Sequence, residues 1–375
     1  MFKKSLAALA VLGAAAGYAS AADVTLFGVV DTGLIYTHQT FADDSKADVN
    51  NFAMDSGVSS ASRFGLKGTE ELGNGLKVGF KLENGFQSDS GALKSEKRIF
   101  DREASVSLYS DFGTLSMGRM GGVGSGAGTY DLVLATADAF DGGDNNVFGF
   151  ATSDRYDNMV TYQTPKFAGL QATVQYSFNE DSVEETAREG SSAVNRYSSA
   201  ALTGDFGALQ TVLAYEFQNY KSFGAAGEHD DGQIVYLGGN YDCGFAKTFV
   251  MGQYFKGIKA GQLTAITEDD ADLFDTANSN GYSADGVKGY GLHLGTIVPV
   301  AGGDLTVAAY FTDFTVEFDN GEDGDAKSYA FGAKYEYYLS KRTSVYTGAG
   351  FAQVKYDDEG SDKTTQAYLG LTHRF

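Results

Sequence analysis

Apolar and polar residues alternate with a period of two along most of this chain, and this alternation constrains the fold more than any other feature. Residues of one parity share one face of a β-strand. In the last ten residues, the apolar parity holds Ala367, Leu369, Leu371, His373 and Phe375, and the wet parity holds Gln366, Tyr368, Gly370, Thr372 and Arg374. Segments of this kind are predicted to be strands with one apolar and one wet face.

The strand-like segments are joined alternately by short turns and long polar connections. Most short turns carry glycine where a tight hairpin needs a positive φ. They lie at 73–75, 111–113, 167–169, 205–207, 242–244, 301–303 and 340–342. The long connections lie near 38–61, 87–101, 121–154, 179–195, 222–232, 259–286, 319–327 and 357–363. This pattern predicts sixteen strands, with both termini on the short-turn side.

Two architectures could use such strands. A soluble sandwich would bury the apolar faces in a core, but loops of about 25 to 35 residues are uncommon in compact soluble domains. A membrane barrel turns the apolar faces to lipid and keeps the wet faces around a water-filled lumen. No apolar stretch of 18 or more residues is present, which excludes helical spans. The sequence therefore predicts an all-β fold, a 16-stranded antiparallel transmembrane β-barrel.

The N-terminus indicates export. Lys3 and Lys4 precede an apolar run from Leu6 to Ala16, and Ala19-Ser20-Ala21 is a small-x-small cleavage site. A membrane anchor is the alternative, but the run falls short of the roughly 20 residues that span a bilayer. Residues 1–21 are predicted to be a signal peptide and residues 22–375 a single domain.

Charge and cysteine content narrow the function. The mature chain would carry 26 − 49 = −23, because the signal peptide removes two lysines and no acids. Such an acidic chain argues against nucleic-acid binding, which needs a basic patch. The single cysteine, Cys243, permits no intramolecular disulfide.

The wet parity of the early strands is unusually basic. Arg63 and Lys67 share one face, and Lys77 and Lys81 follow on the next strand. Arg98, Arg102 and Arg155 lie near the ends of later strands. Cations on a lumen wall set ion selectivity. Ordinary solvated surface is the alternative for each of them.

The connection 121–154 is the most distinctive segment. It begins with the glycine-rich run Gly121–Gly128, and residues 130–140 are predicted to be a short alanine-rich helix that carries Asp131 and Asp138. The predicted helix is followed by Asp141-Gly142-Gly143-Asp144, a sequence that favours a turn. Folded into a barrel, its acids would face the basic wall across a narrow gap. The glycine run does not open into GK[ST], so nucleotide binding is not expected.

Other polar features favour neither an enzyme nor a cofactor site. The acidic runs 180–189, 268–275, 319–325 and 357–362 are interpreted as solvated loop charge or as loose divalent-cation bridges to lipopolysaccharide head groups. The four histidines form no triad or metal-ligand spacing. No cofactor or metal is expected. A surface-binding protein and a barrel hydrolase remain as alternatives to a channel.

Several motifs resemble the general trimeric porins of Gram-negative bacteria, particularly the neisserial and burkholderial type. The matching segments are 22–28, 62–76, 112–119 and 370–375. The resemblance implies a passive outer-membrane diffusion pore for ions and small hydrophilic solutes. It implies a homotrimer in outer-membrane lipid whose third loop folds inward as a constriction. It also implies that the barrel-assembly machinery reads the strand ending at Phe375.

The resemblance also suggests roles for individual residues. Arg63, Arg102 and Arg155 would form the basic side of the constriction, joined by the wall lysines Lys67 and Lys81, and Asp131, Asp138 and Asp141 its acidic side. Two departures stand out. Val29 and Asp31 occupy positions where some porins place a lumen lysine, and Ala139 lies near the position where a constriction acid is often found. In addition, strict parity from Ala104 would point Arg102 outwards, against the family assignment.

Overall fold

The computed structural model describes residues 23–42, 45–142, 149–181, 194–220, 231–263, 284–318, 323–357 and 360–375. Nearly all of its regular structure is β. The strands are β1 (Asp23–Thr40), β2 (Val49–Ser56), β3 (Arg63–Gly73), β4 (Leu76–Gly85), β5 (Glu103–Ser110), β6 (Gly113–Gly121), β7 (Arg155–Gln163), β8 (Leu170–Ser177), β9 (Arg196–Phe206), β10 (Leu209–Asn219), β11 (Gly232–Asp242), β12 (Lys247–Ile258), β13 (Ala284–Val300), β14 (Gly303–Phe318), β15 (Asp323–Tyr338), β16 (Thr343–Tyr356) and β17 (Gly360–Arg374). One helical turn, α2 (Leu134–Ala137), and one 3₁₀ turn, η1 (Ala260–Gln262), complete them.

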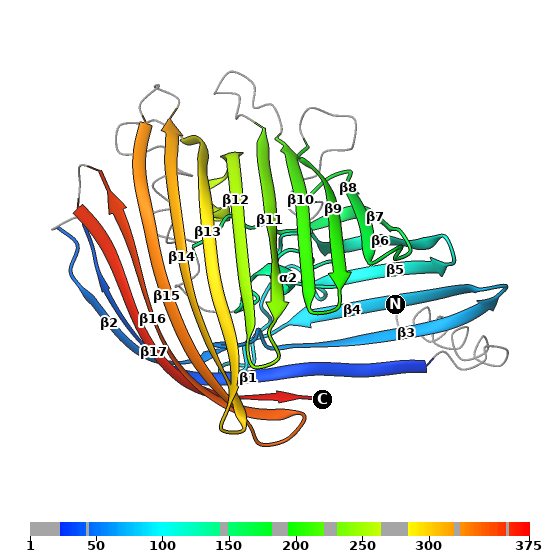
Figure 1. The fold of residues 1–375 in the computed structure, drawn as a ribbon, viewed down its shortest axis with the longest axis horizontal. Helices are drawn as coiled ribbons and strands as arrows, with labels where there is room; N and C mark the ends of the chain where they lie inside the picture. The colour runs from blue at the N-terminus through cyan, green and yellow to red at the C-terminus, as the bar shows by residue number, and fades with distance from the viewer. Residues whose placement is uncertain are drawn as a thin grey trace, which may run out of the picture.

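The strands form one closed antiparallel ring in chain order (Figure 1). The ring closes where β17 pairs with β1, in a register from Val29↔Arg374 to Thr40↔Lys363. β2 and β3 pair with successive stretches of the same edge of β1, so together they occupy one place in the ring. The seventeen segments are therefore a sixteen-stranded barrel, which confirms the predicted fold.

Most connections agree with the sequence pattern. The predicted connections 319–327 and 357–363 are shorter than expected, because β15 already begins at Asp323 and β17 at Gly360. All of the short turns predicted above join neighbouring strands. The predicted long connection 38–61 is wrong: β1 continues to Thr40, and Val49–Ser56 is already strand. The sequence predicts a loop here because most of these residues are polar. In the structure, however, Val49–Ser56 pairs with β1 as a strand. The predicted signal peptide, one of the four histidines (His229) and most of the residues of the acidic runs lie outside the described residues.

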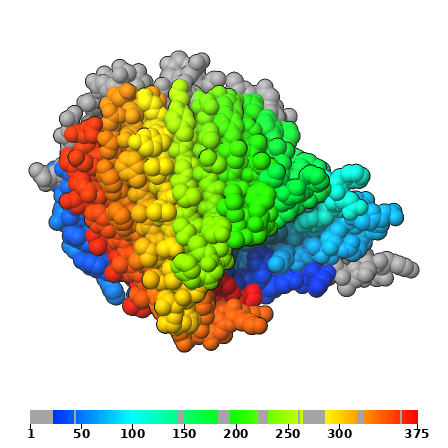
Figure 2. All heavy atoms as spheres, viewed as in Figure 1, coloured from blue at the N-terminus to red at the C-terminus, as the bar shows by residue number. Residues whose placement is uncertain are grey.

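The outer wall is apolar. Leu213 on β10 is 50% exposed and Leu237 on β11 is 64% exposed, whereas their neighbours Val212 and Ala214 are buried on the inner side. Further exposed apolar residues lie on β9–β17. The outer wall of these strands faces the viewer in Figure 2. Large aromatics gather at the short turns, where Phe112 and Phe167 are each 83% exposed. An apolar band edged with aromatics matches the lipid-facing surface of a membrane barrel.

Part of the inner face is apolar as well. On β14 the apolar parity changes between Phe311 and Phe314, as the sequence of a strand does at a bulge or where the strand leaves the membrane. The pairing of β14 with both neighbours runs without interruption at these residues. Phe314 and Val316 instead point inwards and are buried with Tyr310. The interior therefore contains a packed core on this side of the barrel.

In the part of the chain that the structure describes, no helix is long and apolar enough to cross a membrane.

A charged substitution on the outer wall should destabilise the barrel. Leu213→Arg places a guanidinium near the middle of β10, where burial in lipid costs about 2–4 kcal/mol. Unfolding in denaturant, measured in lipid vesicles, should report this loss. Thr69→Arg is the matched control, because Thr69 lies exposed on the inward parity of β3. Equal destabilisation by both variants would contradict the assignment of the lipid face.

Candidate functional site

The connection between β6 and β7 crosses the interior and binds the opposite wall. We call its described residues, 122–142 and 149–154, the pore loop. Gly124 N donates to Glu216 Oε1 on β10 at 2.9 Å, and Asn240 Nδ2 on β11 donates to Thr136 O at 2.7 Å. α2 packs against β10, β11 and β12. The predicted helix over 130–140 is confirmed only as this single turn.

Glu216 is the central contact between the pore loop and the wall. Besides Gly124 N, its carboxyl accepts hydrogen bonds from Tyr197 Oη at 2.6 Å and Tyr236 Oη at 3.2 Å. The side chain is 2% exposed. A Cβ on Gly124 would lie 2.6 Å from Tyr236 Oη. Glycine is thus needed here so that the loop backbone can approach the Tyr236 side chain closely.

Asp138 also serves this attachment. It is 2% exposed, and its carboxylate accepts from Tyr310 Oη at 2.8 Å and Gly142 N at 2.7 Å. His293 Nε2 lies 3.3 Å from Asp138 Oδ1. The structure therefore uses Asp138 to hold the pore loop against the far wall, and Asp138 is not among the residues that line the passage.

The remaining space forms a passage between the pore loop and the wall of β3–β7. It brings together most of the charged residues that the sequence singled out. The charged lining residues are Arg63, Lys81, Glu83, Arg102, Asp131, Asp141 and Arg155. Lys67 is not among the lining residues, and its ammonium lies 5.3 Å from the ring centroid of Phe27.

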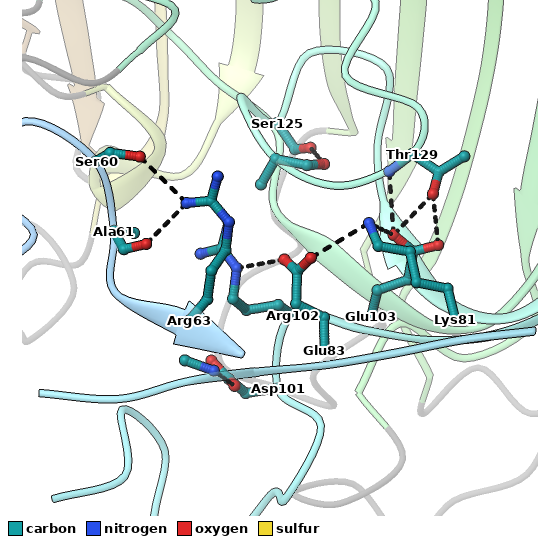
Figure 3. A network of polar contacts seen from close by, with 12 residues as sticks. Ser60, Ala61, Arg63, Lys81, Glu83, Asp101, Arg102, Glu103, Ser125 and Thr129 are labelled. Atoms are coloured by element: carbon teal, nitrogen blue, oxygen red, sulfur yellow. Dashed lines mark hydrogen bonds and ion pairs between the residues drawn. The ribbon is translucent and has the colours of Figure 1, made fainter. Parts of the chain in front are cut away.

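Lys81 and Arg102 are already paired along this wall (Figure 3). Arg102 Nε lies 2.7 Å from Glu83 Oε1, and Lys81 Nζ lies 3.3 Å from Glu83 Oε2 and 2.8 Å from Glu103 Oε2. Glu103 also accepts from Thr129 of the pore loop. The two glutamates were missed as site residues because, on a wet parity, they look like ordinary solvated charge.

Arg102 points inwards, against strict strand parity. It precedes β5, whose inward residues begin with Glu103, so the alternation of the strand does not determine its direction. Its pairing with Glu83 holds the guanidinium at the passage. Within the described residues, Arg63 and Arg155 have no carboxylate at ion-pair distance, in contrast to Arg102. Because neither guanidinium is paired with a carboxylate in the described part of the chain, these two arginines are the excess positive charges of the wall.

Asp131 and Asp141 lie across the passage and share a hydrogen bond between their carboxyl groups. The surrounding protein displaces bulk water from both carboxyls, and this desolvation raises the pKa of Asp131 to about 6. Asp141 stays exposed to the passage, but the same desolvation and the charge of Asp131 raise its pKa to about 8. Asp138 adds to both shifts, and Arg63 opposes the shift at Asp141. Near neutral pH the pair therefore holds about one proton.

Other charged groups outside the passage are structural. Arg98 pairs with Asp157 and Asp181, and Arg119 pairs with Asp157. Among the described residues, no cluster of three or more His, Cys, Asp or Glu side chains is arranged to hold a metal ion.

A closed barrel with an apolar outer wall and a charged, accessible interior defines a membrane channel of the outer-membrane class. The chain belongs to the Gram-negative porin family, whose sequence model matches residues 8–374.

Known proteins similar to this chain support the assignment. An outer membrane porin protein of Bordetella pertussis is 34% identical, with 100% of both chains covered. The structure titled anion-selective porin from Comamonas acidovorans is 25% identical, with a TM-score of 0.65, and the match covers 95% of this chain and 100% of that one. OmpT of Vibrio cholerae, described in a trimer form, shares the fold at 16% identity and a TM-score of 0.57, with 95% and 100% covered.

The chain is therefore a diffusion channel of a Gram-negative outer membrane and not an enzyme.

Loss of the Glu216 acceptor should loosen the pore loop. Glu216→Ala leaves the donors at Gly124, Tyr197 and Tyr236 without this partner, at a cost of about 1–3 kcal/mol for each that stays unpaired. Single-channel recordings should then show increased open-channel noise. Glu216→Gln, which keeps an acceptor oxygen, should show a smaller increase. Quiet currents from the alanine variant would contradict this role.

Proposed function

We propose that the passage between the pore loop and the wall of β3–β7 is the constriction that filters solutes by size and charge. The observation that carries the proposal is the attachment of the loop to β10 and β11 while Asp131 and Asp141 line the same passage as Arg63, Lys81, Arg102 and Arg155. Transport is passive, with no chemical step. Lys67 contributes to the potential below the constriction, and Asp138 acts by holding the loop.

The charge balance favours a modest preference for anions. Arg63 and Arg155 are the excess cations of the wall, and the Asp131–Asp141 pair opposes them with less than its full charge while it holds a proton. Residues beside a narrow passage with low-dielectric walls act at short range. Loop acids farther away than a Debye length of about 8 Å are screened at physiological ionic strength. The similar porin titled anion-selective supports the same sign.

Export and assembly complete the proposal. Residues 1–21 act as a signal peptide, and residues 22–375 form a single barrel domain. The barrel assembles as a homotrimer, as the trimer form of the similar Vibrio protein supports. Its outer wall contacts outer-membrane lipid and lipopolysaccharide. The assembly machinery reads the closing strand, which ends where Phe375 N and O exchange hydrogen bonds with Gly28.

Replacing Arg63 tests the position of the filter. Arg63→Ser should move the reversal potential towards cations in planar-bilayer recordings at moderate salt. The paired control is Asp323→Asn with Asp325→Asn, which removes two acids at the beginning of β15. These should shift the reversal potential towards anions by less than the single Arg63 change. A larger effect of the loop acids would place the filter at the channel mouth.

The carboxyl pair should make selectivity depend on pH. A carboxyl with a raised pKa loses its negative charge as the pH falls through that pKa. Between about pH 9 and about pH 5, Asp141 and then Asp131 should become neutral, so anion preference should increase. Reversal potentials measured across this range should show the increase.

In the same recordings, Asp141→Asn should already be more anion-selective at high pH and should flatten the profile. An unchanged profile in that variant would exclude the pair as the titrating group.

A further inference from the structure

A six-residue interruption separates β2 from β3, and it does not stay in the sheet. Residues 49–56 pair with β1 up to Thr32, and residues 63–69 pair with β1 from Val29. Only Val30 and Asp31 remain opposite residues 57–62. An ordinary β-bulge adds one residue, whereas here six residues face two, and the excess must leave the sheet. We call residues 57–62 the inner bulge.

The inner bulge projects into the barrel. Val58 is 1% exposed and packs with Ile35, Tyr346 and Tyr368, which are buried side chains of the inner wall. Ser59, Ser60 and Ala61 line the same passage as the pore loop. The segment thus faces the loop from the wall side.

Asp31 fixes the inner bulge in this position. Its carboxylate accepts hydrogen bonds from Ser59 N at 3.3 Å, Tyr346 Oη at 2.8 Å and Thr372 Oγ1 at 2.5 Å. Its backbone oxygen accepts from Gly57 N at 2.9 Å and Ser62 Oγ at 2.9 Å. Asp31 is 0% exposed, so it serves as an anchor and not as a free charge in the lumen.

One side chain joins the inner bulge to the pore loop. Lys334, on the inward parity of β15, donates from Nζ to Ser59 Oγ at 2.9 Å. The same ammonium lies 5.5 Å from the ring centroid of Phe140 in the pore loop, within cation–π range. The inner bulge also orients Arg63, whose Nη1 donates to Ala61 O at 2.7 Å and to Ser60 Oγ at 3.3 Å (Figure 3).

We propose that the inner bulge is a second arm of the constriction, and that Lys334 is the positioning residue that couples it to the pore loop. This inference rests on the proposed filter and adds a determinant of its width. The narrowest opening is then set between two fixed backbone segments. The inner bulge limits solute size directly, and it limits anion passage through the position in which it holds Arg63.

Thiol modification tests whether the inner bulge lines the pore. In a Cys243→Ser background, Ser60→Cys should react with a neutral, bulky methanethiosulfonate reagent, and single-channel conductance should fall roughly twofold or more, because the adduct fills the narrowest part. Modification of Thr69→Cys, on the inward parity of β3, should reduce the single-channel conductance much less. Leu66→Cys, on the outward parity, should not respond.

The outcomes separate the two proposals. If the wild-type barrel conducts but the modified Ser60→Cys channel keeps its full conductance, the proposal that the inner bulge is a second arm of the constriction is wrong. Failure of the wild type to conduct overturns the filter itself.

Two substitutions test Lys334 separately from its charge. Lys334→Met removes the ammonium that contacts Ser59 and Phe140, and Ser59→Ala removes only the hydroxyl acceptor. Both should increase open-channel noise and admit larger neutral polymers into the pore. Lys327→Met is the matched control, because it removes a lysine of the outward parity of the same strand. A Lys334→Met effect confined to the reversal potential, with Ser59→Ala unchanged, overturns the coupling.

Discussion

The structure depends on closure of the backbone hydrogen-bond ladder. Within the hydrocarbon of a bilayer, each unpaired N–H or C=O group costs several kcal/mol, so a sheet can span it only without free edges. The pairing of β17 with β1 removes the last two edges. The interruption between β2 and β3 is tolerated because Asp31 and Ser62 supply bonding partners where the ladder is broken. Every other feature of the interior is built on this closed wall.

The interior divides into two halves with different physics. Along β9–β14 the pore loop packs on buried side chains such as Tyr236 and Phe314, as a segment of a soluble protein packs on its core. The wall residues of β3–β7 that line the passage are polar, and paired charges lie there beside Arg63 and Arg155. The attachment on one side therefore creates the charged passage on the other.

The strands and short turns could be predicted from sequence because they depend on local period and on glycine. The roles of Asp31, Asp138, Glu216 and Lys334 could not, since each depends on partners far along the chain. On a wet strand parity these side chains look like any solvated residue. The inner bulge was hidden for a similar reason, because its serines and glycine resemble a surface loop. The inward direction of Arg102 follows from where β5 begins, which alternation alone does not fix.

The apolar packing beneath the pore loop makes the proposed water path eccentric. This path lies beside β3–β7, whereas buried apolar side chains pack beneath the pore loop along β9–β14. Substitutions at lumen-facing positions should therefore have one of two different effects. Changes on β9–β14 act as core mutations, whereas changes along β3–β7 act on permeation. Variants isolated for drug resistance or for altered permeability should therefore carry their substitutions along β3–β7.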